Sequence, residues 1–221
     1  MSIPRITSYP MPAPDEVPES RAGWVLDPDR AVLLIHDMQR YFVRFFPPGE
    51  APVAELIDNV RAMREHCARL GIPVAYTAQP GDMTDEQRGL LKDFWGSGMT
   101  SEPDDREVLA EIRPAAGDLV LTKWRYSALH RTELLEFMRR TGRDQLIVCG
   151  VFAHIGCLMT AADAFTNDVQ PFLVADAVAD FSLEYHRLAL TWAAERCAAV
   201  PVTAAVLAAL AAPRAVGARR R

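Results

Sequence analysis

The stretch AVLLIHDMQ at residues 31–39 constrains the fold more than any other part of the sequence. It starts with five apolar residues in a row, and a short apolar run of this kind is typical of a parallel strand that is covered on both faces. The run ends at His36 and Asp37. Because the carboxyl ends of the strands in an open α/β sheet face the ligand cleft, we expect Asp37 to lie in a binding site.

Strand-like and helix-like patterns alternate along the chain after this first strand. Short apolar runs predict five further strands, at residues 73–77, 118–122, 145–149, 170–175 and 200–203. Apolar residues at helical spacing predict helices at residues 54–70, 85–95, 106–112, 132–141, 156–166, 182–197 and after residue 203. Pro201 cannot donate to a strand ladder, so the last strand belongs at an edge. This alternation predicts an α/β fold with one parallel sheet and helices on both faces.

The length of 221 residues fits a single folded domain, since domains cluster at about 100–200 residues. Prolines at positions 4, 10, 12, 14 and 18 exclude regular helix within residues 1–28 and predict an extended arm that lies on the domain. We therefore expect an arm at residues 1–28, the folded domain at residues 29–212 and a basic tail at residues 213–221.

Composition and short motifs exclude several classes of function. The net charge of -5 offers no basic surface for nucleic acid, and no apolar run reaches the roughly 20 residues of a membrane span. The chain begins without the apolar stretch of a secretory signal, so a cytoplasmic location is expected. The four cysteines form no CxxC pair and are expected to be buried thiols, and the five histidines show no metal-ligand spacing. Neither a nucleotide-binding glycine motif nor a GxSxG elbow occurs.

Polar residues follow several of the predicted strands at the same edge of the sheet. Asp37, Gln79 and Lys123 each come at a strand end, and Gly156 is expected to open a helix. Each residue alone is weak evidence, because a lone Asp after a strand is more often a cap or turn former and a lone Lys is more often a solvated side chain. Together they combine an acid, an amide, a cation and a helix N-terminus, which is a candidate catalytic site. The long excursion between residues 80 and 114 is expected to cover it, and the aromatic segment 41–46 either walls a pocket or covers the core.

Motifs along nearly the whole chain, in order and in spacing, resemble those of the isochorismatases. They are HDMQ with YF, YTAQP, RGLL followed by DFWG, TKWRYS, GVFAHIG, and VADA with ADFS, which begin at residues 36, 41, 76, 88, 93, 122, 150, 174 and 179. The resemblance implies a Rossmann-like three-layer α/β/α sandwich, here with a mostly parallel six-stranded sheet.

The resemblance also implies an activity. Members of the subgroup that this sequence resembles hydrolyse the vinyl ether of isochorismate or 2-amino-2-deoxyisochorismate in siderophore or phenazine-type secondary metabolism, giving pyruvate and a dihydro-hydroxy benzoate or anthranilate. We expect a small chorismate-derived substrate, no cofactor and no metal, and a homodimer or higher homo-oligomer. The sequence leaves open which of the two substrates is physiological.

By the same resemblance, specific residues receive roles. Asp37 is the general acid that protonates the methylene carbon of the enolpyruvyl group, and Lys123 and Gly156 complete the catalytic set. The substrate-binding set is expected to comprise Gln79, Arg88, Trp95, Phe42, Phe152 and Tyr126. The ammonium group of Lys123 lowers the pKa of Asp37, whereas desolvation and the substrate's carboxylates raise it. We expect the raising effect to be the larger one when substrate is bound, because substrate oxygens then occupy Lys123.

Two positions depart from the family pattern. Cysteine hydrolases of the wider superfamily carry their nucleophile where this chain has Gly156, and Cys157 is turned about 100° away from it on a helix. A covalent thiol mechanism is therefore disfavoured. Phe152 stands where the subgroup usually has Tyr, so a phenolic hydrogen bond is absent. The alternatives are a nicotinamidase-like amidohydrolase, which would want a thiol at position 156 and a metal site, and a non-catalytic binding module.

Overall fold

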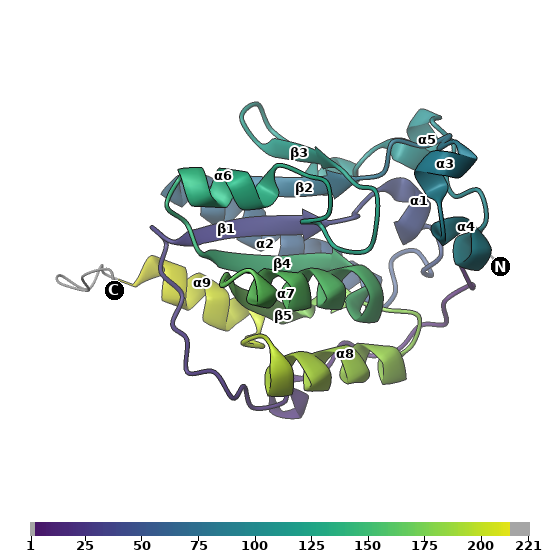
Figure 1. Cartoon of the computed structure of the whole chain (residues 1–221). Coiled ribbons are helices and arrows are strands. Elements are labelled where there is room, and N and C mark those ends of the chain that lie inside the picture. The colour runs from purple at the N-terminus through teal and green to yellow at the C-terminus, as the bar shows by residue number, and fades with distance from the viewer. Residues whose placement is uncertain (1–2, 213–221) are drawn as a thin grey trace.

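Five parallel strands form the sheet at the centre of the computed structural model, which describes residues 3–212 (Figure 1). In spatial order β3-β2-β1-β4-β5, the first strand lies in the middle and is paired on both edges. The strands are β1 (Ala31–His36), β2 (Val74–Ala78), β3 (Leu119–Thr122), β4 (Gln145–Val151) and β5 (Gln170–Ala179). The predicted α/β fold with a parallel sheet is confirmed.

The prediction of a sixth strand at residues 200–203 is wrong. Ala199 forms an isolated parallel bridge to Phe172, and the carbonyl of Pro201 accepts a hydrogen bond from the Ala175 N–H at 2.8 Å. The ring of Pro201 has no N–H with which to continue the ladder, so the chain leaves β5 after this contact.

Helices cover both faces of the sheet (Figure 1). One face is covered by α2 (Val53–Leu70) and α9 (Thr203–Ala211), and the other by α6 (Leu134–Arg140), α7 (Leu158–Thr166) and α8 (Leu183–Arg196). Side chains of β1 alternate between the two layers: Leu33 and Ile35 belong to the first cluster, and Val32 and Leu34 to the second. This alternation explains the continuous apolar run in the sequence, because every residue of β1 is buried.

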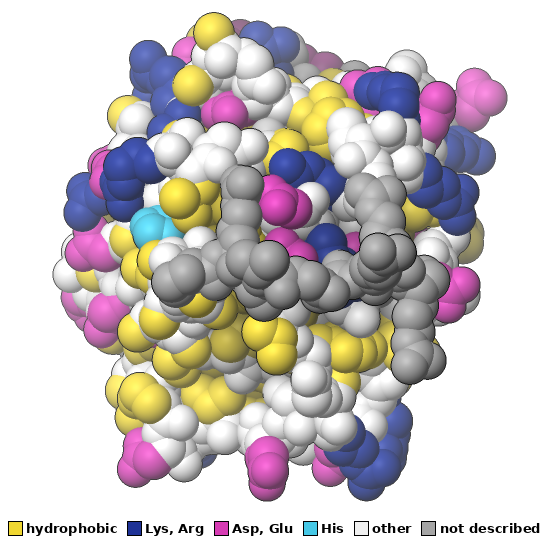
Figure 2. Space-filling model, turned by 90° about the vertical axis from the view of Figure 1, so that its left-hand side faces the viewer, with side chains coloured by type: hydrophobic (Ala, Val, Ile, Leu, Met, Phe, Trp, Pro, Cys, Tyr) yellow, Lys and Arg dark blue, Asp and Glu magenta, His cyan; other side chains and the backbone are white. Residues whose placement is uncertain are grey.

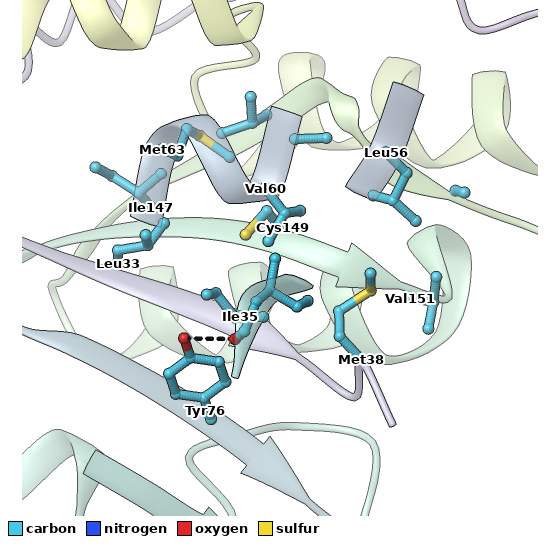
Figure 3. Close-up of a cluster of buried hydrophobic side chains, with 14 of the residues drawn as sticks. Leu33, Ile35, Met38, Leu56, Val60, Met63, Tyr76, Ile147, Cys149 and Val151 are labelled. Carbon is cyan, nitrogen blue, oxygen red and sulfur yellow. Dashed lines mark hydrogen bonds between the residues drawn. The ribbon is translucent and has the colours of Figure 1, made fainter. Parts of the chain in front are cut away.

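The helix α2 shows how the sequence pattern produces the packing. Leu56, Val60 and Met63 lie on one face of the helix and point towards Leu33, Ile35 and other residues of β1 and β4 (Figure 3). The helix ends at Gly71, whose φ of 68° is the left-handed conformation that glycine adopts without a Cβ penalty. The predicted helix at residues 54–70 is confirmed, with its start one residue earlier.

Elements at the carboxyl ends of the strands differ more from the predictions. The helix predicted at 85–95 is two short helices, α3 (Asp85–Arg88) and α4 (Leu91–Trp95), because the chain turns at Gly89 with φ 51° and ψ -139°. The helix predicted at 106–112 is replaced by α5 (Pro103–Arg106) and the 3-10 turn η2 (Ala110–Ile112). A short helix, α1 (Arg40–Val43), lies within the aromatic segment. These short elements gather at one end of the sheet (Figure 1).

The N-terminal residues 3–28 lie along the domain as an extended segment with one 3-10 turn, η1 (Pro14–Glu16). Ile3, Ile6 and Tyr9 are buried against the core, and the N–H of Ile6 donates to the carbonyl of Phe45 at 2.9 Å. The predicted tail at residues 213–221 lies outside the described residues. None of the described helices has the length and apolar composition needed to cross a bilayer.

The end of the molecule where the strands begin is shown in Figure 2. Hydrophobic side chains gather on part of this face, and a shallow groove there runs between the N-terminal segment and α9, lined by residues that include Trp24, Pro201 and Ala209. The predicted catalytic residues lie at the opposite end, where the strands finish.

Leu56→Ala tests the packing of α2 on the sheet. Leu56 is fully buried, so we expect the variant to lose about 2–5 kcal/mol of unfolding free energy through lost burial and a residual cavity. Chemical denaturation measures the loss. The control is Leu70→Ala on the same helix, where the side chain is 43% exposed and the loss should be within about 1 kcal/mol. Equal losses in the two variants would contradict this packing.

Candidate active site

Asp37 and Lys123 form a buried ion pair at the carboxyl ends of the strands. Asp37 directly follows β1, Lys123 directly follows β3, and the Lys123 Nζ donates to Asp37 Oδ2 at 2.6 Å. Both residues are almost completely buried, with 5% and 3% of their surface exposed. An ion pair this deep is held only where the geometry is close and further hydrogen bonds satisfy the charged atoms.

Thr77, at the end of β2 between these two strands, supplies those further bonds. Its hydroxyl donates to Asp37 Oδ1 at 2.6 Å and accepts from the Asp37 N–H at 3.0 Å. The two bonds hold Asp37 in a left-handed conformation, with φ at 51°, that is uncommon for a residue with a side chain. Sequence reasoning missed Thr77, although it lies in the YTAQP motif.

The surrounding protein groups keep Asp37 ionised. Burial acts to raise the pKa of the carboxyl, but Lys123, His36 and the hydrogen bond from Thr77 outweigh it, so the pKa lies below its usual value. Burial and the positive charge of Lys123 lower the pKa of His36 to about 4. The resting pair is therefore carboxylate and ammonium, with a neutral imidazole beside it.

A pocket opens beside this ion pair, and it brings together all nine residues that the sequence predicted for the site. They are Asp37, Lys123, Gly156, Gln79, Arg88, Trp95, Phe42, Phe152 and Tyr126. The pocket is also lined by residues that the sequence reasoning did not select: Ile3, Tyr41, Leu91, Gly98, Arg125, Val151, Ile155 and Phe181. Arg125 and Phe181 lie inside motifs that carried the resemblance, whereas nothing in the sequence pointed to Ile3 of the N-terminal segment.

Arg88 is a buried cation without an acidic partner. Only 4% of its surface is exposed, its Nε donates to the carbonyl of Gly96 at 2.9 Å, and one terminal nitrogen donates to Gln79 Oε1 at 3.2 Å. No carboxylate among residues 3–212 forms an ion pair with it. A buried, unneutralised guanidinium favours an anionic ligand, because its fork can bond both oxygens of a carboxylate.

Two residues that the sequence reasoning missed hold this part of the pocket in place. Gly98, with φ at 85°, leaves room for the guanidinium group, since a Cβ there would stand 2.9 Å from Arg88 Cζ. The fully buried side chain of Gln39 bonds both the N–H and the carbonyl of Gln79, at 2.8 and 2.9 Å. Gln39 thereby fixes the end of β2 and the backbone that carries the Gln79 side chain.

Aromatic rings form the rest of the wall. Phe152 packs against Phe181 with a centroid distance of 4.6 Å and against Phe42 at 6.1 Å. Trp95 of α4 packs on Phe181 at 5.9 Å, and its indole N–H donates to the Tyr126 hydroxyl at 2.9 Å. The aromatic segment 41–46 contributes in both of the ways considered, since its members line the pocket and also cover the core.

Phe181 is held by the buried carboxylate of Asp180. That carboxylate accepts from the Phe181 N–H at 2.8 Å and from the His154 Nδ1 and backbone N–H at 2.7 and 2.6 Å. The N–H of Asp180 in turn donates to the hydroxyl of Tyr9 at 2.7 Å. The N-terminal segment is thus tied to the pocket wall at Tyr9, and its residue Ile3 reaches the pocket itself.

Gly156 lies in the pocket but does not open the helix as predicted. A π-helical turn, η3 (Ala153–Cys157), comes before α7, so the helical backbone begins three residues earlier. Cys157 points into the core cluster between the sheet and α7 and α8 and is fully buried. Burial raises the pKa of its thiol well above the usual value, so Cys157 is not an accessible thiolate. Within residues 3–212 no cluster of three or more His, Cys, Asp or Glu side chains has the arrangement of a metal site.

Known proteins resemble this chain over most of its length. A family model described as "Isochorismatase domain" matches residues 31–205. The phenazine biosynthesis protein PhzD1 of Pseudomonas aeruginosa is 57% identical over 205 residues, which cover 93% of this chain and 98% of that protein. The isochorismatase of Bacillus subtilis is 55% identical over 207 residues, which cover 94% of this chain and 66% of that protein.

A solved structure supports the fold. The crystal structure of a cysteine hydrolase from Pseudomonas syringae pv. phaseolicola superposes with a TM-score of 0.76 at 23% identity, covering 87% of this chain and 96% of that chain. At this identity the likeness concerns the arrangement of strands and helices and not the chemistry of the site.

Lys123→Met tests the charge balance of the buried pair. Without the ammonium group, desolvation should raise the pKa of Asp37 above its usual value of about 3.9. In the wild type, the lowered pKa of Asp37 contributes stability that is present at neutral pH and is lost as the pH falls. In the variant, the raised pKa gives the opposite pH dependence, so the unfolding free energy should increase as the pH is lowered from about 8 towards 5.

At neutral pH this variant should lose about 3–5 kcal/mol of unfolding free energy, because it leaves a buried charge unpaired. Thermal and urea unfolding across this pH range measure both effects. The control is Lys92→Met, which removes the half-exposed partner of Asp85 and should cost less than about 1 kcal/mol. A variant whose stability fell on acidification, as in the wild type, would contradict the assigned charge state.

Proposed function

This chain belongs to the isochorismatase family, and we propose that it hydrolyses the enolpyruvyl vinyl ether of isochorismate or 2-amino-2-deoxyisochorismate. The products are pyruvate and the corresponding dihydro-hydroxy benzoate or anthranilate. The observation that carries the proposal is the Asp37–Lys123 pair at 2.6 Å, set beside the unneutralised Arg88 in one aromatic pocket. An acid, two cations and an apolar wall suit a small cyclic dianion.

The reaction requires a proton on carbon. Asp37 donates its proton to the methylene carbon of the enolpyruvyl group, the ether carbon becomes an oxocarbenium ion, and water adds to it. The resulting hemiketal breaks its bond to the ring oxygen, which leaves as the ring alcohol, and the remaining fragment is pyruvate. Asp37, ionised after the transfer, stabilises the cation beside it and recovers a proton when water adds.

Substrate binding must convert Asp37 from carboxylate to carboxylic acid. The substrate brings two carboxylates into a site with two cations, and Arg88 is free to take one of them in a bidentate contact. When a substrate oxygen also occupies Lys123 Nζ, the bond from that nitrogen to Asp37 weakens. The added negative charge and the exclusion of water then raise the pKa of Asp37. The Thr77 hydroxyl still holds Oδ1, so that Oδ2 is the oxygen that carries the proton.

The aromatic rings give the pocket an apolar wall. Phe152 contributes an apolar edge and no hydroxyl, so the substrate carboxylate nearest to it receives no phenolic hydrogen bond at this position. The hydroxyl of Tyr126 accepts from Trp95 and keeps its own hydrogen for a polar atom of the substrate. No specific observation favours an amidohydrolase, which would use a thiol where this chain has Gly156.

Asp37→Asn tests the acid. An amide cannot donate a proton to carbon, so kcat for pyruvate release should fall by at least about 1,000-fold, and KM should change little because Arg88 and Gln79 are retained. Pyruvate is measured with lactate dehydrogenase and NADH, with isochorismate and its 2-amino-2-deoxy analogue supplied separately. The control is Cys157→Ala, which should keep kcat within about 3-fold, because its thiol takes no part in the proposed reaction. Loss of turnover in the cysteine variant would contradict acid catalysis without a thiol.

The pH dependence of turnover tests the proposed shift on binding. The ratio kcat/KM reports Asp37 in the free enzyme, where the pKa is lowered, and should therefore decline early as the pH rises. The constant kcat reports the substrate complex, where the pKa is raised, so its alkaline limb should lie at a higher pH. Steady-state rates at saturating and low substrate separate the two profiles. A kcat that instead increased with pH through the acid range would show that a deprotonated Asp37 is the active form.

A further inference from the structure

Gly156 is not required by its own backbone. Its φ lies outside the left-handed region that favours glycine, so alanine would be compatible with the local chain. The surroundings forbid it instead. A Cβ at this position would stand 2.1 Å from His36 Cε1 and 2.9–3.0 Å from both ring nitrogens, Nε2 and Nδ1.

The imidazole ring of His36 has no room to move aside. It is completely buried, its Nδ1 lies 2.9 Å from the carbonyl of Val151, and its Nε2 lies 3.3 Å from the carbonyl of Tyr126. Its backbone is held in the sheet, because His36 pairs with Gly150 of β4 and its carbonyl would stand only 2.1 Å from a Cβ at that glycine. As a neutral imidazole the ring has one N–H, so it donates to one of the two carbonyls and lies in contact with the other.

The two carbonyls that the ring approaches belong to segments that come from strands on different sides of β1. Tyr126 lies on the segment after β3 that carries Lys123, and Val151 ends β4 immediately before Phe152. His36 itself lies next to Asp37, with its Nδ1 3.7 Å from Asp37 Oδ2. One buried ring thus spans the space behind the acid and contacts both segments.

We propose that His36 is a positioning residue. Its ring holds the segment after β3, which carries Lys123, in a fixed position relative to the end of β4. The same ring fills the volume that a side chain at position 156 would need. This proposal rests on the proposed function for its kinetic part. Because any side chain at 156 meets the same ring, a nucleophile is excluded there by His36 and not by the absence of a thiol alone. Positions 36 and 156 are therefore coupled.

A double-mutant cycle of His36→Asn and Gly156→Ala tests the coupling. Asparagine places an amide nitrogen near the position of Nδ1, towards Val151, and has no atoms in place of Cε1 and Nε2. In the wild-type background Gly156→Ala should lower Tm by about 5–10 °C through overpacking, and in the His36→Asn background by less than about 2 °C. Gly23→Ala is the matched control, because a Cβ there meets nothing within 4 Å, and it should shift Tm by less than about 2 °C.

Kinetics of the same variants test the positioning role. His36→Asn alone should lower kcat by at least about 10-fold, because Lys123 and Asp37 would no longer be held in a fixed position relative to each other. KM should change by less than about 3-fold, since Arg88 and Gln79 are held by other elements. Rates are normalised to the folded fraction from circular dichroism. If His36→Asn yields no folded protein, His36→Ala replaces it in the cycle, and Gly156→Ala should then raise Tm by filling the space left by the ring.

Equal losses of Tm on Gly156→Ala in both backgrounds would overturn the steric coupling, and an unchanged kcat in the position-36 variant would overturn the positioning role. The thermal cycle needs no substrate. If the wild-type protein released no pyruvate from either substrate, the proposed function would fail while the Tm values still decided whether the two positions are coupled.

Discussion

The buried ion pair between Lys123 and Asp37 is the interaction on which the site depends. Two charges removed from water at this depth are tolerated only with close contact and additional hydrogen bonds, and the order of the strands provides both. Because β2 lies between β1 and β3, its penultimate residue, Thr77, lies beside the carboxylate and bonds the oxygen that Lys123 does not. The ends of three adjacent strands thus supply an acid, a cation and a hydroxyl.

The charges around this pair explain how an anionic substrate could change the protonation state of Asp37. Asp37 and Lys123 neutralise one another, and Arg88 remains as a buried positive charge held by neutral oxygens of Gly96 and Gln79. In the proposed mechanism a dianion would satisfy Arg88 and compete for Lys123, which would remove the main stabilisation of the Asp37 carboxylate. Binding energy from the remote carboxylates would thereby be used to protonate Asp37, which would act as an acid only when substrate is present.

The sequence predicted the parts of this site that obey local rules and missed those that depend on distant contacts. The apolar run before Asp37 predicted its strand and position, because a strand covered on both faces must be apolar throughout. The predicted sixth strand failed at Pro201, where a missing N–H ends the ladder after one bridge. Nothing local marks Ile3 as a pocket residue, since its position follows from Tyr9 bonding Asp180, which lies 171 residues away along the chain.

The glycine at position 156 limits which protein groups can take part in the proposed reaction. Position 156 has no side chain and the neighbouring Cys157 is turned into the core, so the proposed reaction relies on Asp37 as proton donor and on the cation Lys123 bonded to it. A thioester or thiohemiketal would need a bond to the protein that no side chain here is placed to form. Protonation on carbon needs no such bond, because the oxocarbenium ion that it generates reacts with water directly. The His36 ring occupies the volume that a side chain at position 156 would need, so its proposed role in positioning Asp37 and the exclusion of a nucleophile at that position have the same steric cause.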